Sequence, residues 1–202
     1  MIINLLISAI FQLLLFSIIP FVWWVVTAKK ETSYLTWLGI KKIKIKSNQI
    51  FMASFLFVII VLVIPGYLAV AFFIDESAMA TSQFSGKGIS AIIPVLIYAF
   101  LQTGLSEEIF FRGFLTKRLI NRFGFQLGNS IQGILFGLMH GAMFMVLLNP
   151  LEIIIIILIT GVGGYLLGWI NEKQSNGSII SSWLIHGIVN TISSSWALFN
   201  LL

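Results

Sequence analysis

Six long stretches without a charged residue limit what this chain can fold into. They are separated by segments that hold all 12 basic and all 7 acidic residues, and they cover residues 1–28, 47–74, 88–106, 123–151, 153–171 and 174–202. An α-helix needs about 20 mostly apolar residues to cross the hydrocarbon core of a bilayer. We therefore expect an all-α fold, a polytopic transmembrane helical bundle of about six spans within a range of six to eight.

The composition agrees with a membrane protein. Hydrophobic residues make up 58% of the chain and charged residues 9%, whereas a soluble domain carries about 25% charged residues. The first run lacks the basic region and the cleavage signal of a signal peptide, so we expect it to be retained as a span. The expected spans lie near residues 2–27, 49–73, 89–110, 127–148, 151–170 and 179–200. We interpret residues 1–202 as a single integral membrane domain in contact with the lipid bilayer.

Glycines recur at every fourth position of the fourth predicted span, at Gly133, Gly137 and Gly141. Residues four apart share one face of a helix, and small residues on such a face let another backbone approach closely. We expect this face to pack against a neighbouring helix.

The Lys and Arg residues predict which side of the membrane each connection faces, because short cytoplasmic loops are enriched in them. If both ends of a six-span chain lie outside, eleven of the 12 basic residues fall in cytoplasmic connections and only Lys87 falls outside. The reversed orientation inverts this ratio. We therefore expect a multi-pass cell-membrane protein with its basic connections in the cytoplasm.

Residue counts exclude whole classes of chemistry. The chain has no cysteine, which excludes disulfides, thiolate metal ligands and a cysteine nucleophile. Its only aspartate is Asp75, so a site of paired aspartates is excluded as well. The net charge of +5 does not indicate nucleic-acid binding, because the basic residues lie in connections and not in a cluster on a water-exposed face.

A few ionisable residues remain near the ends of the predicted spans: Glu107, Glu108, Arg112, His140 and His186. A charge in the middle of a transmembrane helix costs about 2.5–3.5 kcal/mol on insertion scales, so such residues indicate function by default. Glu108 and Arg112 are four apart and can pair on one helical face. Glu107 is turned about 100° from Glu108, and this leaves one carboxylate without the arginine.

Depth along the helices suggests that three of these side chains meet. At about 1.5 Å per residue from the cytoplasmic ends of their segments, Glu107 and His186 lie roughly 15 Å and His140 roughly 21 Å along their helices. We expect the third, fourth and sixth spans to converge on one site that opens toward the cytoplasm.

These residues belong to three short motifs. Residues 107–112 read EEIFFR and match EExxxR, residues 136–140 read FGLMH and match FxxxH, and residues 186–190 read HGIVN and match HxxxN. In this order and on separate spans, over residues 88–200, they resemble the CAAX protease and bacteriocin-processing (CPBP, or Abi) family of intramembrane proteases. The chain looks more like the compact bacterial members, which implies a bacterial cell membrane.

The resemblance implies a role for each motif residue. Glu107 and His140 would activate a water molecule for attack on a peptide bond, and His186 and Asn190 would form an oxyanion hole. The remaining motif residues would support the site: Glu108, Arg112 and Phe136. The implied substrate is a membrane-associated peptide or protein, and no cofactor is expected.

Two alternatives remain open from the sequence. In a metal-dependent protease, Glu107, His140 and His186 would hold Zn²⁺ and leave a position for water, although the helical HExxH signature of zinc proteases does not occur. The other alternative is not catalytic. The chain would then be a bacteriocin-immunity protein that binds a peptide or a partner in the membrane without cutting it.

Overall fold

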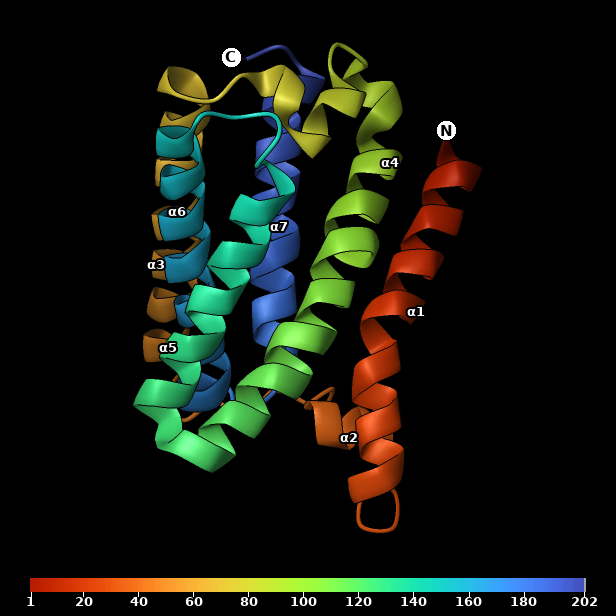
Figure 1. Cartoon of the computed structure of the whole chain (residues 1–202), viewed down its shortest axis with the longest axis vertical. Helices are drawn as coiled ribbons and strands as arrows, with labels where there is room; N and C mark the ends of the chain where they lie inside the picture. The colour runs from red at the N-terminus through yellow and green to blue at the C-terminus, as the bar shows by residue number, and fades with distance from the viewer. Residues whose placement is uncertain (202) are drawn as a thin grey trace.

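A computed structural model describes residues 1–201, except for the side chain of Glu76, and these residues form helices and no strand (Figure 1). The all-α prediction is confirmed. The elements are α1 (Ile2–Thr27), α2 (Tyr34–Leu38), α3 (Asn48–Phe72), η1 (Glu76–Ala78), η2 (Ala80–Phe84), η3 (Gly88–Ala91), α4 (Ile92–Leu96), η4 (Ile97–Leu105), η5 (Glu108–Thr116), α5 (Lys117–Met143), α6 (Pro150–Trp169), η6 (Ile170–Gln174) and α7 (Ile180–Leu198). Helical residues continue without interruption from α4 into α5, and we name residues 92–123 the motif helix.

The number of helices agrees with the expected spans. Four helical stretches within residues 1–201 are long and apolar enough to cross a membrane: Ile2–Thr27, Asn48–Phe72, Gly88–Met143 and Pro150–Gln174. The third stretch has 56 residues and reverses direction at Gly124, whose φ of 77° and ψ of 169° are not helical. Figure 1 shows this reversal at the lower end of the bundle. It supplies the third and fourth predicted spans, and α7 lies at the position of the sixth.

The motif helix is longer than predicted. The expected third span ended at residue 110, whereas the helix continues to residue 123 and holds Glu107 and Arg112 in its interior. The predicted span ended before Arg112, but the structure buries Arg112 inside the bundle together with Glu107 and Glu108. The predicted end of the fourth span, at residue 148, was also wrong, because α5 ends at Met143.

Two sections of the motif helix, η4 and η5, are π-helical, and Glu107 lies between them. The hydroxyl groups of Thr103 and Thr116 donate hydrogen bonds to carbonyl oxygens five residues earlier, at 3.0 and 2.8 Å. π-Helical segments are rare and frequently occur at functional sites. The EExxxR motif therefore lies in unusual backbone and not at a frayed helix end.

The glycine face of α5 packs against α6, which confirms the predicted close approach. A Cβ atom added at Gly133 would lie 2.9 Å from the carbonyl oxygen of Gly161, and one added at Gly137 would collide with the carbonyl oxygen of Ile157. Near the same contact, the buried Gln132 amide donates to the carbonyl oxygen of Gly164 at 2.6 Å. The two backbones thus lie so close that a side chain does not fit between them.

The start of α7 is held by two other parts of the chain. The backbone N–H of Ile179 donates to the carbonyl oxygen of Gly39 at 3.0 Å. From the motif helix, the Lys117 ammonium donates to the carbonyl oxygen of Gly177 at 2.8 Å, just before α7 begins. These contacts fix the first turn of the helix that carries the HxxxN motif.

We predict that Gly137→Ala destabilises the fold by about 1–3 kcal/mol, because the added methyl group forces the α5 and α6 backbones apart. Gly66→Ala is the matched control, since Gly66 lies in α3 with open space around it. The control should leave stability unchanged or raise it by about 0.5–1 kcal/mol, because alanine has a higher helix propensity than glycine. Unfolding in detergent, followed by circular dichroism, measures both. Equal unfolding transitions for the two variants would contradict the close contact between α5 and α6.

Candidate active site

A cavity of about 250 Å³ lies between the motif helix, α3, α5, α6 and α7. Glu107 reaches it from the motif helix and His140 from α5, while His186 and Asn190 reach it from α7. All four residues that the motifs indicated as chemically active therefore line one space.

Glu107 lies between the two imidazole rings. Its Oε2 atom is 3.9 Å from Nε2 of His140 and 3.8 Å from Nε2 of His186. Both separations are too long for a direct hydrogen bond, and each is a length that one water molecule can bridge. The structure thus brings together the three side chains that depth along the helices had suggested would meet.

His140 is held by its own helix. Its Nδ1 atom lies 2.9 Å from the carbonyl oxygen of Phe136, one turn earlier. A carbonyl oxygen only accepts hydrogen bonds, so Nδ1 carries the hydrogen and Nε2 of the neutral ring has the free lone pair. That lone pair is on the nitrogen nearest Glu107, where the ring can accept a proton from a water molecule.

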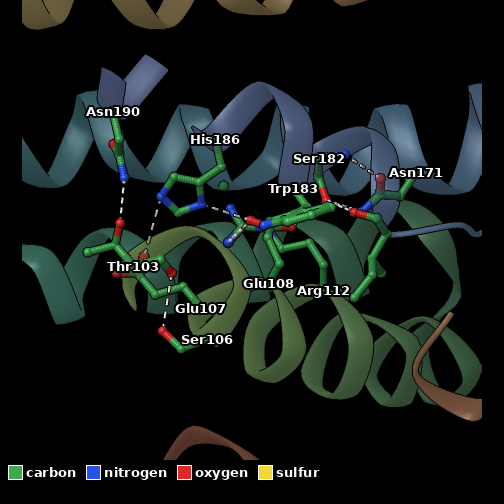
Figure 2. Close-up of polar contacts among 12 residues, drawn as sticks. Thr103, Ser106, Glu107, Glu108, Arg112, Asn171, Ser182, Trp183, His186 and Asn190 are labelled. Carbon is green, nitrogen blue, oxygen red and sulfur yellow. Dashed lines mark hydrogen bonds and ion pairs between the residues drawn. The ribbon is translucent and has the colours of Figure 1, made fainter. Parts of the chain in front are cut away.

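His186 is held by a carboxylate from the motif helix. Its Nδ1 atom lies 3.1 Å from Oε1 of Glu108 (Figure 2). An ionised carboxylate only accepts, so Nδ1 of His186 donates. The ring therefore presents Nε2 to the cavity, and in the imidazolium form this atom is a donor.

The neighbouring glutamates have different surroundings. Glu108 and Arg112 have no exposed side-chain surface, and their charged groups lie 3.2 Å apart, as predicted for residues four apart. The Arg112 guanidinium also lies 4.1 Å from the centre of the Phe136 ring. Among residues 1–201, no protein group donates a hydrogen bond to the buried Oε2 atom of Glu107. Arg112 thus neutralises one carboxylate and leaves the other to face the histidines.

Asn190 is oriented by a residue that the sequence did not single out. Its Nδ2 atom donates to the hydroxyl oxygen of Thr103 at 2.8 Å (Figure 2). An amide nitrogen carries two hydrogens, so a second hydrogen bond can still be donated. Asn190 and His186 are one turn apart on α7 and line the same cavity.

A second cavity, of about 540 Å³, also reaches Glu107. It lies between α1, the motif helix and α5, and its polar lining includes Gln12 and Gln102. The Gln12 amide donates to the Ser106 hydroxyl at 3.2 Å, which connects α1 to the residue before Glu107. The Glu107 side chain is therefore bordered by cavities on two sides.

Sequence reasoning missed the polar residues that surround the motifs. Thr103 and Ser182 precede Glu107 and His186 by four residues, and this spacing could have placed them on the same helical faces. Asn171 bonds to Ser182 from the end of a different helix, and no spacing relates these two residues. These residues carry no charge, so the cost of placing a charge inside a membrane does not indicate them.

The same geometry bears on metal binding. Both histidines direct Nδ1 to an oxygen acceptor and Nε2 toward Glu107, and metal-binding histidines are commonly held in this way. Across the described residues, no group of three or more His, Cys, Asp or Glu side chains has the arrangement of a metal site. The expectation that no cofactor takes part stays a prediction.

Comparison with known protein families gives a match over the segment that contains the motifs. A family model described as type II CAAX prenyl endopeptidase Rce1-like matches residues 89–192. The matched segment covers just over half of the chain and contains all three motifs. No curated protein and no solved structure matches the chain.

We predict that Arg112→Met destabilises the fold by about 3–5 kcal/mol, because it leaves the Glu108 charge buried without its partner. Arg122→Met is the control, since Arg122 is exposed on the same continuous helix. Adding Glu108→Gln to the Arg112 variant should recover part of the loss. Unfolding in detergent measures the stability of the Arg112 variant, the Arg122 control and the double variant. An Arg112 variant as stable as the control would contradict the prediction.

Proposed function

Because the chain belongs to the type II CAAX prenyl endopeptidase Rce1-like family, we propose that it is an intramembrane endopeptidase. It hydrolyses a peptide bond of a membrane-associated peptide or protein. The observation that carries the proposal is the position of Glu107 between two imidazole rings that are oriented by different partners.

The first step activates water. A water molecule placed between the Glu107 carboxylate and Nε2 of His140 has two acceptors for its hydrogens. As its oxygen attacks the carbonyl carbon of the peptide, one proton passes to this pair. A positioned acid or base of this kind typically contributes a factor of about 10²–10⁴ to the rate.

The second step stabilises charge and releases the amine. His186 in its imidazolium form and the Asn190 amide donate hydrogen bonds to the oxyanion of the tetrahedral intermediate. The proton held by Glu107 and His140 then passes to the leaving nitrogen as the carbon–nitrogen bond breaks. The products are a carboxylic acid and an amine, and the site returns to its starting protonation state.

A metal-dependent protease is the second candidate. The observation that favours it is the shared orientation of the two histidines, with Nδ1 anchored and Nε2 facing Glu107. Glu107, His140 and His186 would hold Zn²⁺ only in an arrangement that the described residues do not show, and the ion would supply an acidified water molecule. Both candidates use the same three side chains, so a metal measurement must separate them.

We predict that Glu107→Gln lowers peptide cleavage at least about 10²-fold, because the base is lost while the side chain keeps its size. His140→Ala and His186→Ala should reduce it by about 10²–10³-fold. Glu31→Gln, in an exposed connection, is the matched control. Proteomics of membrane peptides from cells that express each variant measures the outcome. If partner function persists in all three site variants at normal expression, the chain binds without cutting.

Chelation decides between the two candidates. We expect phenanthroline to leave cleavage unchanged in purified protein that elemental analysis shows to be free of metal. Loss of activity with the chelator, together with stoichiometric zinc in the active preparation, would instead establish the metal-dependent mechanism. The control Glu31→Gln should behave like the unsubstituted protein in both measurements.

The basic connections are proposed to face the cytoplasm of a bacterial cell, and this topology can be tested directly. Lys44 and Lys87 are exposed in connections expected on opposite sides of the membrane. The chain has no cysteine, so Lys44→Cys and Lys87→Cys each introduce a unique thiol. An impermeant thiol reagent added to intact cells should label Lys87→Cys alone. Labelling of Lys44→Cys alone would show that the orientation is the opposite of the expected one.

A further inference from the structure

A line of buried polar groups continues from His186 to the end of α6 (Figure 2). Glu108 accepts from His186 through Oε1, at 3.1 Å, and its Oε2 atom accepts from the Ser182 hydroxyl. The Asn171 amide donates to the Ser182 oxygen at 2.7 Å. Glu108 and Ser182 have no exposed surface and Asn171 has 1%. Glu108, which anchors the His186 ring, is therefore held through Ser182 by Asn171 at the end of α6.

Counting hydrogens gives each bond a direction. Asn171 makes two bonds to Ser182, because its Oδ1 atom also accepts from the Ser182 backbone N–H at 3.1 Å. This fixes the amide so that Nδ2 donates to the hydroxyl oxygen. The single hydroxyl hydrogen of Ser182 is then directed to an acceptor, and Glu108 Oε2 is closer than the Ile179 carbonyl oxygen at 3.1 Å.

The two oxygens of Glu108 depend on different donors. Oε1 lies near both His186 and Arg112, at 3.1 and 3.2 Å. Oε2 accepts from Ser182. Without the Ser182 hydroxyl, the carboxylate is held on one side only, so it can rotate about its own bond axis. The acceptor that fixes the His186 ring then loses its fixed position.

We propose that Ser182 and Asn171 are positioning residues, which act through Glu108 to hold His186 in the orientation that presents Nε2 to the cavity. Asn171 also has a structural role, because the Ser182 N–H that it binds belongs to the first turn of α7, where backbone donors lack helical partners. Ser182 is therefore the position at which orientation of His186 can be tested separately from capping of the helix.

The chain has two histidines, so selective ¹⁵N-histidine labelling of the full chain in detergent gives the ring signals of His140 and His186 alone. His140→Ala assigns them. We expect Ser182→Ala to shift the His186 ring resonances and to leave those of His140 in place. The matched control is Ser181→Ala, because Ser181 is equally buried but its hydroxyl bonds to Ser175 at 2.7 Å and not to Glu108.

The unchanged His140 signals report that the fold is intact. Unchanged His186 signals in Ser182→Ala would overturn the proposal, and so would equal shifts in the Ser181 control. If Ser182→Ala does not fold, Asn171→Ala takes its place as the test variant. Asn171→Ala keeps the Ser182 hydroxyl group but removes the amide that fixes its direction. In that variant, unchanged His186 signals would again overturn the proposal.

A kinetic measurement adds a second readout that rests on the proposed proteolytic function. We expect Ser182→Ala to lower kcat about tenfold, because a hydrogen bond to a charged group is lost, and to change KM less than about twofold. A rise in KM with constant kcat would oppose a positioning role. If the unsubstituted protein cleaves no peptide, the proposed function fails, while the NMR measurement still tests the positioning of His186.

Discussion

The buried ion pair of Glu108 and Arg112 connects the parts of the site. Burial of two charges is unfavourable unless their remaining hydrogen-bonding groups are satisfied. Here Ser182 and His186 donate to the carboxylate, whereas the Arg112 nitrogens have no hydrogen-bond partner among the described residues and the guanidinium lies over the Phe136 ring. These neighbours come from α5 and α7, so the surroundings of one ion pair bring three helices together. The three motifs meet because each contributes a group to this pair.

The three motifs can come into contact because the helix backbones lie close together. Gly187 follows His186 directly, and a Cβ atom there would collide with the Phe100 ring of the motif helix. The Gly133 and Gly137 positions bring α6 against α5 in the same way. Small residues thus bring the histidine-bearing helices close to their neighbours, and interhelical packing of this kind is typical in a bilayer, where apolar side chains gain little by leaving lipid.

The sequence predicted the fold better than the surroundings of the site. Charge-free runs located the long helices, because lipid excludes charges from exposed helical surface. The same rule misplaced the end of the motif helix, since Glu107 and Arg112 are buried in protein and not in lipid. Residue spacing related side chains of one helix, such as Glu108 and Arg112. It carried no information on the contact between Asn171 and Ser182, because that contact depends on the packing of two helices.

The proposed division of work between the two histidines follows from their anchors. His140 donates from Nδ1 to a neutral carbonyl oxygen of its own helix, whereas His186 donates to a carboxylate that is already paired with Arg112. The carbonyl anchor leaves the free lone pair of His140 on Nε2, which faces Glu107, so the first imidazole is suited to act as a base. The Glu108 anchor directs Nε2 of His186 into the cavity, so in its imidazolium form the second is suited to donate. Identical side chains thus acquire different chemistry from the acceptor behind each one.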